Sequence, residues 1–319
     1  MVFAIMSSGG DAAGMNPAIK KFVDYCYKIK IETYLIYDGL EGLIENKIKK
    51  ASHKDVAGII HMGGTIIRSS RSQRFFDTFY RKQAYNNLKL HNITGLIVLG
   101  GDGSFRAMEI FSSEFNINFV GIPSTIDNDI YGTEYCLGVD TALNVIRDAL
   151  DKIRDTASSF NRAFVIEIMG RESGFLAVVS SIVSGAEICV IPEIEFEGEK
   201  LEKRLKNEIK NGRRYIIAIV AEGTKKTGEI YEWIQEKLEL ETRVTILGHV
   251  QRGGNPTVHD RMMAFDFTIR AVDFLRENTN VNKIVVYNKG EYSFMDIKEV
   301  VTHQYQLPVH YLNAINYLD

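Results

Sequence analysis

The sequence predicts an α/β protein of two lobes, each built on a mainly parallel sheet. Short apolar runs alternate with helical patterns along the chain, which is the order that right-handed crossovers between parallel strands produce. Glycine-bearing polar turns directly follow several of these runs. The 319 residues suffice for two domains. Because open α/β sheets bind ligands beyond the carboxyl ends of their strands, the turns mark the candidate sites.

Two of these turns lie within Gly100–Asp129. The runs Gly95–Leu99 and Asn118–Ile122 before them read as buried strands. The first turn, Gly100–Ser104, carries three glycines and opens the helical pattern Phe105–Ser113. Glycines let backbone N–H groups approach phosphate oxygens, and a helix N-terminus favours negative charge. The first turn therefore predicts a phosphate site.

Carboxylates in both turns indicate a metal. Asp102 would repel phosphate unless a cation lay between them, and Mg²⁺ takes hard oxygen ligands and bridges phosphates. The second turn adds Asp127 and Asp129, which would point the same way in an extended loop. Helix capping is the ordinary explanation of one such turn. Two turns in succession favour a phosphate-and-metal site.

The remaining strands and helices follow from the same two patterns. A third strand–glycine–helix unit opens the chain, where Pro17 occupies a first helical position and Asn16 is expected to cap it. Apolar runs predict strands at Val2–Met6, Thr33–Tyr37, Ala163–Ile168, Ile188–Ile191, Tyr215–Val220, Thr242–Leu247 and Ile284–Tyr287. Helical spacing predicts helices at Pro17–Lys28, Gly138–Thr156, Phe175–Ser184, Gly198–Lys210, Gly228–Leu238, Val258–Arg276 and near Val309–Tyr317.

Charged side chains mark the strand ends of the second lobe. Arg171, Glu222, and His249 with Arg252 follow three of its strands, and Arg162 and Arg243 lie near other strand ends. Arginines bind phosphate through their forked donors. A single carboxylate among them, Glu222, would accept a hydrogen bond from a hydroxyl group of a sugar. The residues alone thus indicate a kinase that uses ATP or pyrophosphate and acts on a small phosphorylated sugar.

Composition excludes several other classes. The 38 basic and 41 acidic residues give a net charge of −3, so no nucleic-acid or anionic-membrane partner is indicated. No apolar run approaches the roughly 20 residues of a membrane span, and the N-terminal run is too short for a signal peptide. The three separate cysteines indicate free thiols in a reducing compartment. We expect a cytoplasmic protein.

The motifs SSGGDAAGMN, LGGDGS, PSTIDND, MGRESG, AEG and LGHVQRGG together resemble those of the bacterial-type ATP-dependent 6-phosphofructokinases, in order along essentially the whole chain. This resemblance implies two doubly wound lobes with the active-site cleft between them. Residues 1–137 and 251–301 would form the ATP-binding lobe. Residues 138–250 and 302–319 would form the lobe that binds fructose 6-phosphate. The product would be fructose 1,6-bisphosphate, and the assembly a homotetramer.

The resemblance also assigns roles to residues. Asp127 would be the general base, Arg171 would stabilise transition-state charge, and Asp102 would associate with Mg²⁺, with Asp129 as a second contributor. Thr125 would lie beside the transferred phosphoryl group. ATP contacts would come from Gly9, Arg71, Ser72, Gly101, Gly103 and Ser104. Sugar contacts would come from Met169, Gly170, Glu222, His249 and Arg252, with Arg162 and Arg243 reaching over from a neighbouring subunit.

Donor choice is predicted sterically. Gly103 leaves room for the nucleotide α-phosphate where pyrophosphate-dependent relatives carry aspartate, and Ser124 stands where those relatives carry lysine. Both favour ATP. Leu40, Ser72 and Phe76 depart from the bacterial pattern, which leaves nucleotide selectivity open. A pyrophosphate-dependent enzyme and a non-catalytic sugar-phosphate sensor are the alternatives, since NAD kinases and diacylglycerol-type lipid kinases share only the GGDG turn.

Effector control by ADP and phosphoenolpyruvate is the weakest part of the resemblance. The matching positions are Lys20, Arg154, Gly185, Glu187 and Arg213. However, Asp24 replaces a basic phosphate ligand, and the residues at Lys54, Gly58 and Asn211 also differ. A carboxylate that faces a diphosphate lowers affinity. We therefore expect regulation to be weak or absent.

Overall fold

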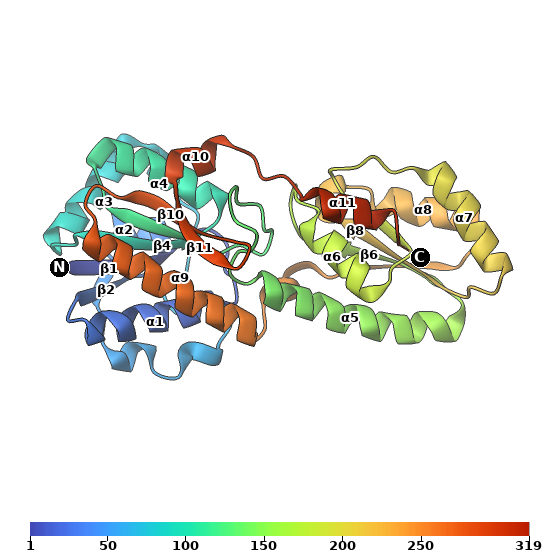
Figure 1. Ribbon diagram of the computed structural model, residues 1–319, viewed down its shortest axis with the longest axis horizontal. Helices are drawn as coiled ribbons and strands as arrows, with labels where there is room; N and C mark the ends of the chain where they lie inside the picture. The colour runs from blue at the N-terminus through green and yellow to red at the C-terminus, as the bar shows by residue number, and fades with distance from the viewer. Residues whose placement is uncertain (319) are drawn as a thin grey trace. The chain divides into compact units, whose positions relative to one another are not determined.

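A computed structural model describes residues 1–318, which form two compact units (Figure 1). Unit 1 comprises residues 1–141 and 252–305, and unit 2 comprises residues 142–251 and the chain from 306 onward. The chain thus passes between the units at 141/142, 251/252 and 305/306. The boundaries predicted from the sequence are 137/138, 250/251 and 301/302.

A seven-stranded sheet forms the centre of unit 1, in the order β11-β10-β5-β4-β1-β2-β3. Its inner strands are parallel, and the two edge strands β3 and β11 are antiparallel to their neighbours. β4 and β5 are buried along their whole length because helices cover both faces of the sheet. The strands are β1 (Val2–Ser7), β2 (Glu32–Ile36), β3 (Ile48–Lys50), β4 (Gly95–Gly100), β5 (Phe119–Pro123), β10 (Asn282–Asn288) and β11 (Glu291–Asp296).

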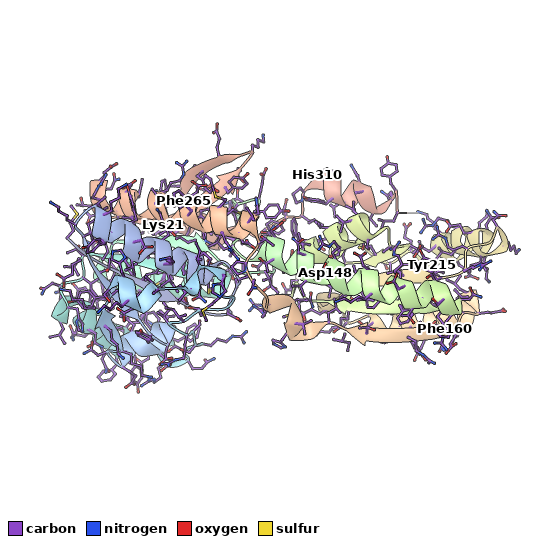
Figure 2. The ribbon with its side chains drawn as sticks, turned by 90° about the horizontal axis from the view of Figure 1, so that it is seen from below. Lys21, Asp148, Phe160, Tyr215, Phe265 and His310 are labelled. Atoms are coloured by element: carbon purple, nitrogen blue, oxygen red, sulfur yellow. The ribbon has the colours of Figure 1, made fainter. Side chains whose placement is uncertain are left out.

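The helices of unit 1 lie on the two sides of this sheet (Figure 1). On one side α1 packs against α9, where the ammonium of Lys21 lies 4.0 Å from the ring centroid of Phe265 (Figure 2). On the other side α4 contacts α3 and α10. The helices are α1 (Met15–Lys28), α2 (Gly39–Ile44), α3 (Thr78–Leu90), α4 (Asp102–Phe115), α9 (Val258–Glu277) and α10 (Ile297–Thr302).

The start of α1 differs from the prediction. Asn16 is not the cap but the second residue of the helix, and it is 1% exposed. Its amide donates to the carbonyl oxygens of Met62 (3.2 Å) and Gly63 (3.0 Å) and accepts from the N–H of Ile66 at 2.7 Å. The prediction was wrong because these donors and acceptors belong to a loop about fifty residues away.

Unit 2 contains a four-stranded parallel sheet in the order β7-β8-β6-β9. Apolar residues of β6, β7 and β8 pack against Leu205, Ile230, Ile234 and Leu238 to form its core. Its strands are β6 (Ala163–Ile168), β7 (Ile188–Val190), β8 (Ile216–Ala221) and β9 (Thr242–Ile246). Its helices are α6 (Phe175–Ser184), α7 (Gly198–Lys210), α8 (Thr227–Leu238), α11 (Val309–Ile315) and α5 (Val139–Phe160), whose first turn lies in unit 1.

Two further predictions concern the chain as a whole. Cys26, Cys136 and Cys189 are free thiols, as expected, and the first two are buried while the third is partly buried. Across residues 1–318, no helix combines the length and apolar character that a membrane span requires.

Candidate active site

The glycine turns of unit 1 meet where the strand order reverses. The chain leaves β1 toward β2 on one side, and leaves β4 toward β5 on the other, so β1 and β4 flank a switch point of the sheet. The N–H of Ser8 donates to Leu99 O at 2.8 Å. A Cβ atom on Gly9 would lie 3.1 Å from Ser104 Oγ, and one on Gly100 would lie 3.1 Å from Ser8 O. The two turns therefore fit together only because glycines leave room.

The predicted phosphate and metal residues open helix α4. Gly101 is the residue before the helix, Asp102 is its first residue, and Ser104 is buried beneath the turn. A Cβ atom on Gly103 would meet no atom within 4 Å, so this side of the helix start is open. Asp102 forms an ion pair with Arg106 at 2.8 Å. The backbone N–H groups of this turn suit phosphate oxygens. The partly exposed carboxylate suits an Mg²⁺ ion that is bound mainly through those phosphates.

The second turn, residues 124–129, is anchored beside the first. The N–H of Ser124 donates to Gly100 O at 2.9 Å. Thr125 Oγ1 accepts the N–H of Asp127 and lies 3.3 Å from Asp127 Oδ2. The carboxylate of Asp127 is deeply buried, with 1% of the residue exposed. The hydroxyl and the carboxylate predicted to act on the transferred group are thus held against each other.

The expectation that this loop is extended is wrong. Asn128 has φ +50°, in the left-handed region, so Asp127 and Asp129 are not related by strand geometry. Both carboxylates nevertheless lie near Cys136. Burial raises the pKa of the Cys136 thiol well above its usual value, and the negative charges of Asp129 and Asp127 raise it further.

Arg252 lies beside this loop in unit 1. Its Nη2 is 4.0 Å from Asp127 Oδ2, and its Nη1 donates to the carbonyl oxygen of Asp11 at 3.3 Å. A Cβ atom on Gly10 would come within 2.7 Å of the guanidinium. A cation predicted to bind the sugar phosphate therefore lies next to the predicted base.

The predicted nucleotide residues outside the glycine turns are less uniform. Arg71 is exposed, whereas Ser72 is buried and donates to Glu41 at 2.5 Å. Leu40 is 5% exposed, so it belongs to the core, and Phe76 is 70% exposed. Of the three positions that depart from the bacterial pattern, Leu40 and Ser72 are thus buried and Phe76 is exposed.

In unit 2 the predicted sugar residues Met169, Gly170, Arg171 and Glu222 come together at the carboxyl ends of β6 and β8. Glu222 Oε1 accepts the N–H groups of Gly170 (3.3 Å) and Arg171 (3.1 Å). A Cβ atom on Gly223 would collide with Arg171 O at 1.7 Å, so this approach requires glycine. Glu222 therefore holds the turn that follows β6.

Gln251 is a residue of this site that the sequence reasoning missed. It is 1% exposed, its Oε1 accepts the N–H of Met169 at 3.2 Å, and its Nε2 donates to Gly248 O at 3.0 Å. It thereby ties the turn after β6 to the turn that carries His249, which is exposed. The available signal was its place in the LGHVQRGG motif.

Arg162 and Arg243 do not join this group within one chain. Arg162 precedes β6, and Arg243 pairs in register with Phe164 at the start of that strand. Both guanidinium groups bind Glu241, at 2.7 and 2.5 Å. They lie at the amino edge of the sheet, whereas Arg171 and Glu222 lie at its carboxyl edge. Within one chain, the arginines near the strand ends of unit 2 therefore do not form a single group.

The predicted effector residues fall on both units. In unit 2 Glu187 is buried, accepts the N–H of Ile217 at 2.6 Å and pairs with Arg213. Arg154 donates to Ser184 O and lies beside Gly185. Burial raises the pKa of the Glu187 carboxyl.

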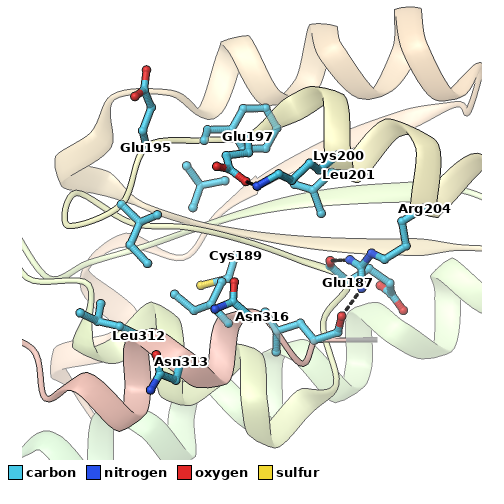
Figure 3. Close-up of a pocket in the computed structure, with 15 residues that line it drawn as sticks. Glu187, Cys189, Glu195, Glu197, Lys200, Leu201, Arg204, Leu312, Asn313 and Asn316 are labelled. Atoms are coloured by element: carbon cyan, nitrogen blue, oxygen red, sulfur yellow. Dashed lines mark hydrogen bonds and ion pairs between the residues drawn. The ribbon is translucent and has the colours of Figure 1, made fainter.

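Glu187 also borders a pocket of roughly 500 Å³ between β7, α7 and α11. The carbonyl oxygen of Glu187 accepts from Arg204 at 2.6 Å there (Figure 3). Lys20 lies in unit 1 and pairs with Asp24 at 2.8 Å. Asp24 also binds His53 at 2.6 Å, so the residue that replaces a basic ligand is fixed by two partners of its own.

Known proteins resemble this chain over most of its length. The sequence profile of the family described as phosphofructokinase matches residues 2–275. The ATP-dependent 6-phosphofructokinase of Sulfurimonas denitrificans is 57% identical over 305 residues, which are 95% of both chains. That of Wolinella succinogenes is 52% identical over 310 residues, which are 97% of both chains.

Solved structures show the same fold. A phosphofructokinase from Saccharomyces cerevisiae superposes with a TM-score of 0.90 and 33% identity over 94% of this chain, which spans 45% of the yeast chain. A pyrophosphate-dependent phosphofructokinase from Marinobacter aquaeolei superposes with a TM-score of 0.83. At 18% identity, the second likeness concerns the fold alone.

Proposed function

Because the chain belongs to the phosphofructokinase family, we propose that it transfers the γ-phosphoryl group of ATP to the 1-hydroxyl group of fructose 6-phosphate. The products are fructose 1,6-bisphosphate and ADP, and the reaction is a step of glycolysis. Unit 1 supplies the ATP-binding residues and unit 2 most of the residues that bind the sugar phosphate. The observation that carries the proposal is the buried Asp127 carboxylate, held by Thr125 next to a glycine cradle.

Phosphoryl transfer requires positioning, charge neutralisation and one proton acceptor. Asp127 accepts the proton of the sugar 1-hydroxyl while the oxygen of that hydroxyl bonds to the γ-phosphorus. The bond between the γ-phosphorus and the bridging oxygen of ATP breaks, and ADP leaves. The N–H groups of Gly101 and Gly103 and the Ser104 hydroxyl orient the phosphates. Arg171 neutralises charge that develops on the transferred group. Mg²⁺, held by Asp102 and the phosphates, would supply further charge neutralisation.

Sugar recognition is proposed to divide between two chains. Glu222 and His249 bind hydroxyl and phosphate groups of fructose 6-phosphate from their own chain, beside the backbone of Met169 and Gly170. Arg162 and Arg243 bind the 6-phosphate of the neighbouring subunit's substrate. Their position at the far edge of the unit 2 sheet supports this assignment. A homotetramer in the cytoplasm is the form we propose.

A coupled aldolase assay tests the proposal. We expect ATP to support formation of fructose 1,6-bisphosphate because the open side of Gly103 accommodates an α-phosphate. We expect pyrophosphate to give little or none because Ser124 stands where pyrophosphate-dependent relatives carry a lysine. Turnover with pyrophosphate but not with ATP would mean that the enzyme is a pyrophosphate-dependent phosphofructokinase. No turnover with any donor would support a sugar-phosphate sensor instead.

The same assay with ADP or phosphoenolpyruvate tests regulation. Burial opposes ionisation of Asp24, but hydrogen bonds from Lys20 and His53 outweigh it and lower the pKa of this carboxyl. A fixed negative charge there opposes binding of an anionic effector. We therefore propose near-hyperbolic kinetics with little effect of either compound. Strong sigmoidicity that ADP relieves would contradict this.

A further inference from the structure

Residues 124–138 carry Asp127 and Asp129, yet they contain neither strand nor helix. The segment runs between the end of β5 and the start of α5. Backbone ladders therefore cannot hold the two carboxylates in place. Reacting groups must be held to a fraction of an ångström, and a displacement of about 1 Å costs roughly 10²-fold in rate. Something other than secondary structure must fix this loop.

Asn128 lies between the two aspartates and spans the loop. It is 1% exposed. Its Nδ2 donates to Glu134 O at 2.9 Å, and its Oδ1 accepts the N–H of Cys136 at 2.9 Å. With φ +50°, Asn128 adopts the left-handed conformation that asparagine tolerates better than most residues. The backbone of Asn128 thus turns the chain, and its side chain connects this point of the loop to residues 134 and 136.

The far side of this closure is attached to the sheet. The N–H of Glu134 donates to Tyr287 O in β10 at 2.8 Å, and Thr133 Oγ1 accepts the N–H of Tyr287 at 3.0 Å. The N–H of Leu137 donates to Pro123 O at the end of β5, at 2.9 Å. Asn128 is therefore bonded to a segment that two strands hold in place.

We propose that Asn128 is a positioning residue for phosphoryl transfer, fixing the carboxylates of Asp127 and Asp129 by locking their loop to the segment 133–137. This inference rests on the proposed function and deepens it. A positioning residue acts on the chemical step, so its loss lowers kcat and leaves substrate binding nearly unchanged. A purely structural residue would lower the amount of folded enzyme or weaken binding instead.

Asn128→Gly is the first test, because glycine keeps the left-handed conformation and removes both hydrogen bonds. We expect kcat to fall about 10²-fold, with the KM values for fructose 6-phosphate and ATP nearly unchanged. Asn92→Gly is the matched control, since Asn92 is exposed with φ +53°. Calorimetric titration with fructose 6-phosphate should give the wild-type stoichiometry, which excludes a fraction of inactive molecules.

A second variant keeps the inference testable if Asn128→Gly fails to fold. Thr133→Val removes the hydrogen bonds of this hydroxyl with Tyr287 and Tyr135 and leaves both aspartates and Asn128 unchanged, and it should lower kcat in the same manner to a smaller extent. A kcat of Asn128→Gly equal to that of Asn92→Gly would overturn the inference, as would a loss that appears in KM or stoichiometry. An inactive wild-type enzyme would instead overturn the proposed function.

Discussion

A single buried carboxylate determines what this site can do. Asp127 is 1% exposed, with the Thr125 hydroxyl at 3.3 Å and the Arg252 guanidinium at 4.0 Å. The guanidinium offsets part of the cost of burying an ionised carboxylate, which burial alone would disfavour. The group is therefore suited to accept a proton from an alcohol that is brought to it.

Replacing that carboxylate should remove base catalysis and little else. For Asp127→Ser we expect kcat to fall by about 10²–10⁴-fold, while fructose 6-phosphate binding stays near the wild-type level because the other proposed sugar ligands, Glu222, His249 and Arg252, are unchanged. Steady-state kinetics and calorimetric binding measure the two effects separately. Unchanged turnover would remove the base assignment.

Gly103 permits a separate prediction on donor choice. Asp at this position should raise the KM for ATP strongly, since its carboxylate would occupy the open space beside the α-phosphate and repel it. Stability should not fall, because acidic residues are favourable in the first turn of a helix. Gly228→Asp is the matched control, as Gly228 is also the second residue of its helix and faces open space. Equal KM values in both variants would contradict this prediction.

The sequence identified these residues more readily than it identified their supports. For Asp102, Asp127 and the glycines, the residue type and the position directly after a strand indicate the chemistry. Gln251 and Asn128 are ordinary amides whose roles depend on which turns meet in space. No spacing along the chain contains that information.

Elements with clean periodicity were predicted closely. β6 and α6 match their predicted bounds to the residue: β6 is buried at five of its six positions, and α6 buries the apolar run 175–178. Helix α3 was missed because it buries Arg81 instead of an apolar residue and exposes Phe79 at 68%. Arg81 is paired with Glu114 at 2.6 Å, a partner thirty-three residues away. Burial of a charge with a distant partner breaks the pattern that predicts a helix.

Helix α5 begins at a carboxylate from another helix. Asp260 of α9 is fully buried and accepts the N–H groups of Gly138 and Thr141, each at 2.8 Å, and the Thr141 hydroxyl at 2.5 Å. For Asp260→Asn we expect a loss of about 1–3 kcal/mol in the free energy of unfolding, since an amide N–H would face these donors. Urea unfolding measures it, and an unchanged midpoint would contradict the role.

The pH dependence of that loss has a definite sign. Burial raises the pKa of Asp260 above the ordinary aspartate value of 3.8, so the folded state binds this proton more tightly than the unfolded state. The stability linked to this proton is fully present below pH 3.8 and is lost as pH rises through the folded-state pKa. The variant lacks this titration. The difference in stability between wild type and Asp260→Asn should therefore narrow as pH rises above 3.8.

At the scale of the molecule, one chain does not bring all the predicted sugar residues together. Arg162 and Arg243 lie at the start of β6 and β9, whereas Arg171 and Glu222 follow the ends of β6 and β8. The six residues of β6 span roughly 16–20 Å, more than an arginine side chain can reach. Both arginines instead bind Glu241 in the isolated chain. This position is why we propose that Arg162 and Arg243 act on another chain's substrate.

A shared site predicts rescue between two defective chains. Arg243→Ala should raise the KM for fructose 6-phosphate, and Asp127→Ser should be almost inactive. In a mixed oligomer, the Arg243→Ala chain supplies its own Asp127 while its neighbour supplies Arg243, so one of the two sites is intact. Coexpressed, differently tagged chains purified through both tags should therefore exceed the sum of the two parents at low fructose 6-phosphate.

Arg252→Ala coexpressed with Asp127→Ser provides the control. Arg252 and Asp127 lie 4.0 Å apart on one chain, so exchange between neighbours cannot restore both in one site, and no rescue is expected. Rescue in neither pair would mean that each chain completes its own site, and the arginine pair at the far edge would then serve the stability of unit 2 alone. Rescue only in the first pair would mean that residues of two subunits bind the 6-phosphate of the same substrate molecule.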